Sequence, residues 1–157
     1  MPTSDVRIPT GTSVYIDHLQ TAMHLNTTGY QGGEGPAILF DDKDFNDWPG
    51  EEWKFTSHGN DIYTIKNTQT GHYLAMAAGP GRKYPHVEVQ SKPDGGDFHW
   101  IVRFSGLYDS FTLHPSTDPK RSIQPRMPPA AQGGQLWTAP HHGYLNELFK
   151  VVPGRAN

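Results

Sequence analysis

The feature that most constrains this chain of 157 residues is a sequence pattern that recurs three times along it. Each copy opens with a short segment of alternating apolar and polar residues and continues, after a polar turn, with a second short segment. The aliphatic anchors of the two segments are 9, 9 and 10 residues apart in the three copies, and they are Ile16 and Leu25, Ile65 and Leu74, and Leu113 and Ile123. A repeat of this kind governs the whole fold, because each copy needs its neighbours to bury an apolar face.

Two further short strands complete each copy, so the pattern predicts twelve strands in three units of four. The predicted ranges are 13–18, 23–26, 37–40 and 52–55 in the first unit, 61–67, 72–75, 87–90 and 99–102 in the second, and 110–114, 121–124, 134–137 and 148–151 in the third. The closing strands carry Trp53, Trp100 and Phe149, at intervals of 47 and 49 residues. We expect these aromatic rings to fill a shared core and assign them no role in binding.

Composition agrees with an all-β chain. The 17 Gly and 14 Pro interrupt any long helix and supply the turns that short strands require. No interior linker separates domains, so we expect a single domain over residues 1–157 with repeats at about 13–57, 58–106 and 107–153. The two ends, 1–11 and 153–157, are expected to be loosely held.

Charge and cysteine content restrict the partners and the chemistry. The formal net charge of -3 offers no basic face to nucleic acid, and the absence of Cys excludes disulfides and thiolate catalysis. The first residues lack the basic and apolar regions of a secretory signal, and no run of about 18 apolar residues occurs. We therefore expect a cytoplasmic protein, or one released without a classical signal, that does not insert into membranes.

The second repeat carries the clearest family signature, in the run from Tyr63-Thr-Ile65-Lys-Asn67 through Gly71 to Leu74. This run resembles the ricin B-type lectins, whose repeats read Tyr-x-Ile-x-Asn, then Ser-Gly-x-x-Leu-Asp, and close with Gln-x-Trp. The closing positions here read Glu51-Glu52-Trp53, Phe98-His99-Trp100 and Glu147-Leu148-Phe149, so all three lack the Gln. The resemblance covers about Ser13 to Val152 and implies a β-trefoil with pseudo-threefold symmetry.

The same resemblance implies a function. It indicates a lectin without catalytic activity or cofactor, similar to the small cytoplasmic lectins of fungi, that binds galactose- or N-acetylgalactosamine-type glycans of glycoproteins or glycolipids. A role in defence is part of what the resemblance suggests. Single sites of this kind are shallow, so useful avidity needs two sites on one chain or a homodimer.

In this family a sugar is held by an acidic or amide residue after the second strand, an aromatic residue at the end of the third, and an Asn beside the closing Gln. The resemblance maps these roles in the third repeat onto Gln124, Trp137, Asn146 and Glu147, with His141 beside the site. In the first repeat it maps them onto Asn26, Phe40 and Glu51, with Asp44 and Trp48 in the loop between. The second repeat has Ala75, Gln90 and Asp97 at these places and is expected to bind poorly.

Several alternatives stay open at this point. Trp137 is either a ligand platform or a partly buried packing residue, Trp48 is either a loop anchor or an exposed contact, and the amides of Asn26 and Gln124 are equally suited to capping turns. His141 and His142 are adjacent and are expected to point to opposite faces of a strand, which is poor spacing for a metal site.

The acidic run 41–47 has neither the pattern of a calcium loop nor that of a catalytic carboxylate pair. A rival function is protease inhibition through exposed loops, with candidates at 79–85, which contains Arg82 and Lys83, and at 118–126.

Overall fold

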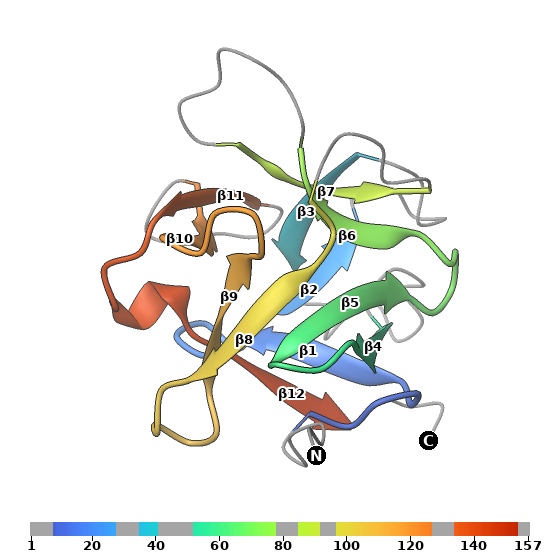
Figure 1. Ribbon diagram of the computed structural model, residues 1–157, viewed down its shortest axis with the longest axis horizontal. Coiled ribbons are helices and arrows are strands. Elements are labelled where there is room, and N and C mark those ends of the chain that lie inside the picture. Colours follow the sequence, from blue (N-terminus) through green and yellow to red (C-terminus); the bar gives the residue numbers. More distant parts are fainter. Residues whose placement is uncertain are drawn as a thin grey trace.

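The computed structural model describes residues 8–27, 35–40, 52–77, 85–91, 97–126 and 134–153. These residues form twelve β-strands and one three-residue 3-10 helix, η1 (Figure 1). The strands are β1 (Val14–His18), β2 (His24–Thr27), β3 (Gly35–Phe40), β4 (Glu52–Ser57), β5 (Ile62–Asn67), β6 (Tyr73–Met76), β7 (Val87–Gln90), β8 (Trp100–Phe104), β9 (Phe111–Pro115), β10 (Arg121–Pro125), β11 (Gly134–Pro140) and β12 (Phe149–Pro153), and η1 spans Leu145–Glu147. All twelve predicted strands are confirmed.

Six of these strands form a closed ring. Each pairs antiparallel with two neighbours, in the order β1, β4, β5, β8, β9, β12 and back to β1. The other six form the hairpins β2–β3, β6–β7 and β10–β11, and β3 also pairs with β7 and β11. A six-stranded barrel with three hairpins beside it is a β-trefoil, which confirms the predicted fold. Closure of the barrel leaves few free strand edges.

The pseudo-threefold symmetry extends to individual backbone hydrogen bonds. In each unit, the residue that follows the first strand donates its N–H to the carbonyl of the residue before a closing aromatic. The bonds are Leu19 N to Leu148 O at 2.9 Å, Thr68 N to Glu52 O at 3.0 Å, and Ser116 N to His99 O at 3.0 Å. Each bond joins one unit to the unit on one side of it, so the three bonds link the units in a cycle.

The closing aromatic rings lie in the core, as predicted. Trp53, Trp100 and Phe149 are completely buried. The indole Nε1 of Trp53 donates to the carbonyl of Leu25 at 3.0 Å, and that of Trp100 donates to Leu74 at 2.9 Å, so the two tryptophans make the same bond in successive units. Phe149 has no ring N–H and fills the third place by packing alone.

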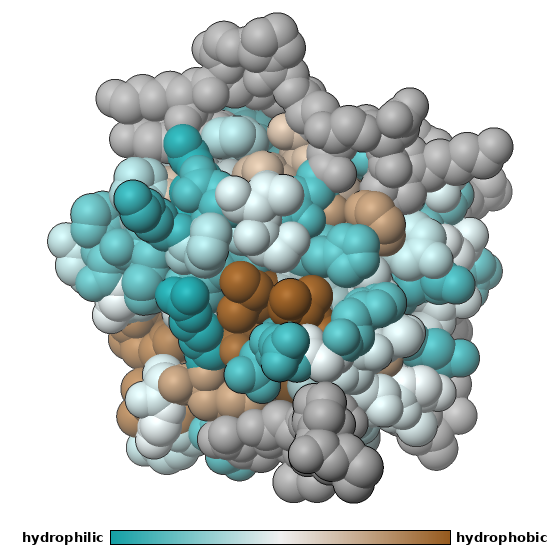
Figure 2. Space-filling model, in the orientation of Figure 1, coloured by the Kyte–Doolittle hydropathy of each residue, from teal (hydrophilic) through white to brown (hydrophobic). Residues whose placement is uncertain are grey.

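The surface around this core is largely polar. Figure 2 shows mostly hydrophilic side chains on one face, with a small hydrophobic group near its centre. Among the residues described, the large hydrophobic side chains that are exposed are Leu107, Tyr108, Tyr144 and Leu145. No helix in the described part of the chain is long and apolar enough to cross a membrane.

The expectation of a loose N-terminal end is wrong for part of its range. Ile8 is 1% exposed and belongs to the hydrophobic core, and Gly11 donates its N–H to Phe55 O at 3.1 Å. The apolar alternation Val6-Arg7-Ile8 ends at Pro9 and is too short to predict a strand, so the sequence pattern did not place Ile8 inside. The predicted repeat boundaries stay a prediction.

Replacing Trp100 with Phe tests the buried indole bond. The fold accepts Phe at the equivalent position 149, so we expect Trp100→Phe to fold but to leave the Leu74 carbonyl without its donor. The free energy of unfolding in urea should fall by about 1–3 kcal/mol, the cost of an unsatisfied buried polar group. Tyr108→Phe, which removes an exposed hydroxyl, should change it by less than about 0.5 kcal/mol. Equal stability of Trp100→Phe and the wild type would contradict this role.

Candidate functional site

The β10–β11 hairpin brings together two of the predicted site residues. Gln124 on β10 pairs directly with Trp137 on β11, and side chains of paired residues share one face of a sheet. Gln124 is only 8% exposed, whereas Trp137 is half-buried. The amide Nε2 of Gln124 donates to Pro140 O at 2.9 Å, to Ser122 Oγ at 3.2 Å and to Ala139 O at 3.3 Å. The orientation of this amide is therefore fixed by the hairpin itself.

The strand pairing corrects the predicted equivalence of the three repeats. Asn26 and Ala75 occupy the place of Gln124, and their partners across the hairpin are Ile38 and Glu88. Phe40 and Gln90, which the sequence aligned with Trp137, instead pair with His24 and Tyr73, two residues further along. The ends of equivalent strands can differ by two residues while the same face stays buried, because the side-chain period of a strand is two. At this register position the third hairpin places an aromatic residue opposite an amide, whereas the second hairpin makes such a pair two residues away, between Tyr73 and Gln90.

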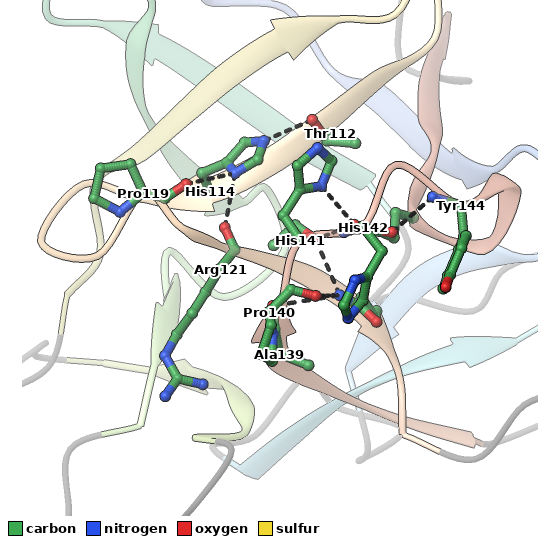
Figure 3. Close-up of polar contacts among 12 residues, drawn as sticks. Thr112, His114, Pro119, Arg121, Ala139, Pro140, His141, His142 and Tyr144 are labelled. Atoms are coloured by element: carbon green, nitrogen blue, oxygen red, sulfur yellow. Dashed lines mark hydrogen bonds and ion pairs between the residues drawn. The ribbon is translucent and has the colours of Figure 1, made fainter.

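Glu147 is a buried carboxylate at the base of the loop that follows β11. Its side chain is 0% exposed. Ser122 Oγ and His141 Nδ1 each donate to Oε1 at 2.6 Å, while the backbone N–H groups of Tyr144 and His142 donate to Oε2 at 2.8 and 3.2 Å (Figure 3). Because both oxygens are engaged inside the protein, Glu147 supports the loop and does not face a ligand.

The hydrogen bonds of Glu147 also decide its charge. Burial alone would raise the pKa of this carboxyl, but the donors Ser122, the Tyr144 backbone and His141 favour the ionised form and together lower the pKa below its usual value. His141, one third of whose side chain is exposed, therefore donates to a carboxylate. The network links Gln124 through Ser122 to Glu147 and on to His141.

His114 lies beneath this network and is neutral. It is completely buried, donates from Nδ1 to Arg121 O at 2.7 Å, and accepts at Nε2 from Thr112 Oγ1 at 2.6 Å. Desolvation, followed by the positive charge of Arg103, lowers the pKa of His114 to about 4. Its ring meets that of His141 edge to face, with centroids 4.8 Å apart (Figure 3).

Asn146 is held in place by the first repeat. His18 is buried and donates from Nε2 to the backbone carbonyl of Asn146 at 2.8 Å. The Nδ1 atom of His18 accepts from Thr21 Oγ1 at 2.8 Å. Burial lowers the pKa of His18, which favours this neutral form. The side-chain Oδ1 of Asn146 is buried and has no hydrogen-bond partner among the residues that the structure describes. An amide with unmet bonding capacity thus lies beside the supported loop.

The structure describes only part of the site predicted in the first repeat. Asn26 is completely buried, its Oδ1 accepts from Thr27 N at 2.8 Å, and its Nδ2 has no partner within the described part of the chain. The backbone of Phe40 ends β3, but its side chain lies outside what is described, as do Glu51, Asp44 and Trp48. The described residues therefore place one member of this candidate site.

Asp97 in the second repeat is structural. It is 8% exposed, and its carboxylate accepts from Thr117 N at 2.7 Å, His99 N at 2.9 Å, Thr117 Oγ1 at 3.0 Å and Ser116 Oγ at 3.1 Å. It thus anchors the β9–β10 turn. With Ala75 opposite Glu88, the second repeat has no amide–aromatic pair at the position that Gln124 and Trp137 occupy in the third.

The structure also corrects two other expectations. His141 and His142 lie in the loop after β11, not in a strand, and both donate to Glu147. Residues 118–126 do not form an exposed inhibitory loop, because most of this segment is β10 and Ser122–Pro125 are buried. The other proposed inhibitory loop spans residues 79–85. Its residues 79–84, which include Arg82 and Lys83, lie outside the described part of the chain.

Two residues around the site were not predicted from the sequence: Ser122 and Tyr144. Ser122 was detectable in principle, because the period of two in β10 places it on the same face as Gln124. His142 and Tyr144 lie in an irregular loop, where no periodicity shows which side chains converge. Within the described ranges no cluster of three or more His, Cys, Asp or Glu is placed to hold a metal ion.

Comparison with known proteins identifies the fold. No protein-family model and no curated protein sequence matches the chain. A ricin B-like lectin from Macrolepiota procera, solved with lactose, superposes with a TM-score of 0.76 at 10% identity, over 95% of this chain and 100% of that one. The C-terminal half of an earthworm R-type lectin, solved with GalNAc, gives 0.67 at 18% identity, over 89% and 97%.

A Clostridium perfringens endo-β-galactosidase that releases GlcNAcα1-4Gal also contains a matching region. Its TM-score is 0.69 at 16% identity, and the match covers 92% of this chain and 33% of the enzyme. At these identities the likeness concerns the fold alone. It confirms the β-trefoil that the repeats predicted.

Replacing Glu147 with Gln tests the buried carboxylate. Because the folded pKa is lowered, its stabilisation is fully present above the unfolded value of 4.5 and is lost as the pH falls through the lower folded value. At pH 7 we expect Glu147→Gln to lower the free energy of unfolding by about 1–3 kcal/mol. The difference from wild type should shrink below pH 4.5 in urea titrations at several pH values.

Glu88→Gln is the matched control, since it makes the same chemical change at a half-buried position on β7. It should cost less than about 0.5 kcal/mol. A Glu147→Gln protein as stable as wild type at pH 7 would show that the carboxylate does not support the loop.

Proposed function

We propose that this chain is a carbohydrate-binding protein without catalytic activity, and that it recognises galactose- or N-acetylgalactosamine-type glycans through its third repeat. The observation that carries the proposal is the pairing of half-buried Trp137 with the oriented amide of Gln124 on one face of the β10–β11 hairpin. The fold is that of lectins solved with lactose and with GalNAc, which supports the proposal but does not fix the sugar.

The chemistry of a sugar fits this arrangement. A pyranose presents a C–H face that packs on an aromatic ring and a rim of hydroxyls that both donate and accept hydrogen bonds. Trp137 would supply the ring and Gln124 a planar polar group. Asn146 Oδ1, which has no partner in the described ranges, would accept from a sugar hydroxyl once its side chain turns toward the ligand. His141 is exposed at the edge of the same network.

The charge state of the site supports binding without hydrolysis. Glycoside cleavage generally needs a carboxylic acid whose pKa is raised so that it can protonate the leaving oxygen. Glu147 has the opposite shift and is enclosed by donors. Asp118, the other carboxylate near β10, pairs with Arg121 at 2.8 Å.

The remaining parts of the proposal rest on the sequence. We place the protein in the cytoplasm, with a defensive role against organisms that carry its glycans. A second site in the first repeat, around Asn26, or a homodimer would supply the avidity that one shallow site lacks. These parts are separable from the third-repeat site, which is tested first.

Trp137→Ala tests the site directly. We expect binding to galactose- and N-acetylgalactosamine-terminated glycans to weaken at least about tenfold, equivalent to about 1.4 kcal/mol, because the stacking ring is lost. Binding is measured on a glycan array and by titration calorimetry with lactose, and circular dichroism confirms that the variant is folded. Tyr108→Ala removes an exposed aromatic in the β8–β9 turn, away from β10 and β11 (Figure 1), and should bind as wild type does.

Two results would contradict the proposal in different ways. Unchanged binding by Trp137→Ala would remove the third-repeat site while leaving a lectin. A wild-type protein that binds no glycan on the array would refute carbohydrate binding altogether, and assays against trypsin-like and papain-like proteases would then test the rival function.

A further inference from the structure

The loop that follows β11 carries two large hydrophobic side chains that are exposed to solvent. Of the four large hydrophobic side chains that are exposed in the described part of the chain, two are Tyr144, at 61%, and Leu145, at 46%. The other two lie together in the β8–β9 turn. An exposed tyrosine beside a candidate sugar site requires an explanation, because aromatic rings dominate the energetics of binding surfaces.

The ring of Tyr144 is fixed in orientation although it is exposed. It stacks on the imidazole of His142, with ring centroids 5.2 Å apart and planes inclined by 23°. Gly143 between them has a φ of +78°, the left-handed conformation that glycine adopts without strain and that allows the chain to turn here. The second face of the Tyr144 ring remains available, since most of the side chain is in solvent.

The backbone beneath these rings is also fixed. Glu147 accepts from the N–H groups of both His142 and Tyr144, so one buried carboxylate holds both residues that carry the rings. Preorganised groups bind with less loss of conformational entropy than mobile ones. A loop of this kind is suited to presenting a rigid aromatic surface.

From this geometry we propose that Tyr144, backed by His142, forms a second stacking surface that contacts the next saccharide unit of a glycan whose terminal sugar is held at Gln124 and Trp137. The inference rests on the proposed function of the third repeat. Hydrogen bonds from Gln124 to Ser122, from Ser122 to Glu147 and from Tyr144 to Glu147 connect the two surfaces, so one buried network fixes their relative positions.

A saccharide suits this surface better than a protein partner. The aromatic pair is small and is bordered by groups that donate and accept hydrogen bonds, including the Tyr144 hydroxyl and the His142 ring. A stable protein interface needs about 800 Å² from each partner, much more than two side chains provide. A sugar ring, by contrast, needs one aromatic face and a few polar neighbours.

The test separates the terminal sugar from its neighbour. Wild type, Tyr144→Ala, Tyr144→Phe and Tyr108→Ala are titrated with galactose and with lactose, and folding is checked by thermal melting. We expect Tyr144→Ala to bind galactose as wild type does but to bind lactose about tenfold more weakly, near the affinity for galactose. Tyr144→Phe keeps the ring and should retain most of the lactose affinity, and Tyr108→Ala should match wild type with both sugars.

The possible results distinguish this inference from the function on which it rests. If Tyr144→Ala binds lactose as wild type does, the second stacking surface is refuted and the third-repeat site stands. If it loses galactose and lactose equally, Tyr144 belongs to the primary site or to its support, and the inference is also refuted. If wild type binds neither sugar nor any other glycan on the array, the proposed function fails and the inference fails with it.

Discussion

The fold depends on the burial of three large closing aromatics at one centre. Trp53, Trp100 and Phe149 come from different units, and none of the three units could cover its own ring with four short strands. The cyclic hydrogen bonds of Leu19, Thr68 and Ser116 tie each unit to its neighbour near these rings. Loss of one unit would expose apolar surface on the other two, so the three must fold together.

This shared core frees the hairpins to differ. Ile16, Ile65 and Leu113 are all completely buried in one hydrophobic core, whereas the residues across the hairpins face different neighbours. The third unit pairs Gln124 with Trp137, while the second pairs Ala75 with Glu88. The symmetry of the core therefore supports a surface that is asymmetric, and a candidate site in one unit does not imply three.

The sequence was sufficient for the fold because its signal was repeated. The spacing of aliphatic anchors and closing aromatics is set by strand length and barrel geometry, and three copies of a weak pattern reinforce one another. It was less informative for the site. Gln124 and Trp137 were predicted from the family pattern, but the equivalence with Phe40 and Gln90 was wrong, since strand register depends on pairing that no single segment encodes.

Glu147 shows a further limit of reasoning from sequence. The family pattern assigned it to the sugar, yet four surrounding donors make it an internal support, and its charge enables this role. An ionised carboxylate accepts in every direction, whereas the amide of the family's Gln would present its NH₂ group to some of these donors. The Glu at this position is therefore coupled to the loop it holds.

Two buried, neutral histidines also support the loop that follows β11. When neutral, each ring donates from one nitrogen to a backbone carbonyl and accepts at the other, His114 from Thr112 and His18 from Thr21. Burial keeps both rings neutral by lowering their pKa values. Asn146 and His141 are thus positioned by groups in two repeats, so the geometry of the third-repeat site is a property of the assembled trefoil and not of the third unit alone.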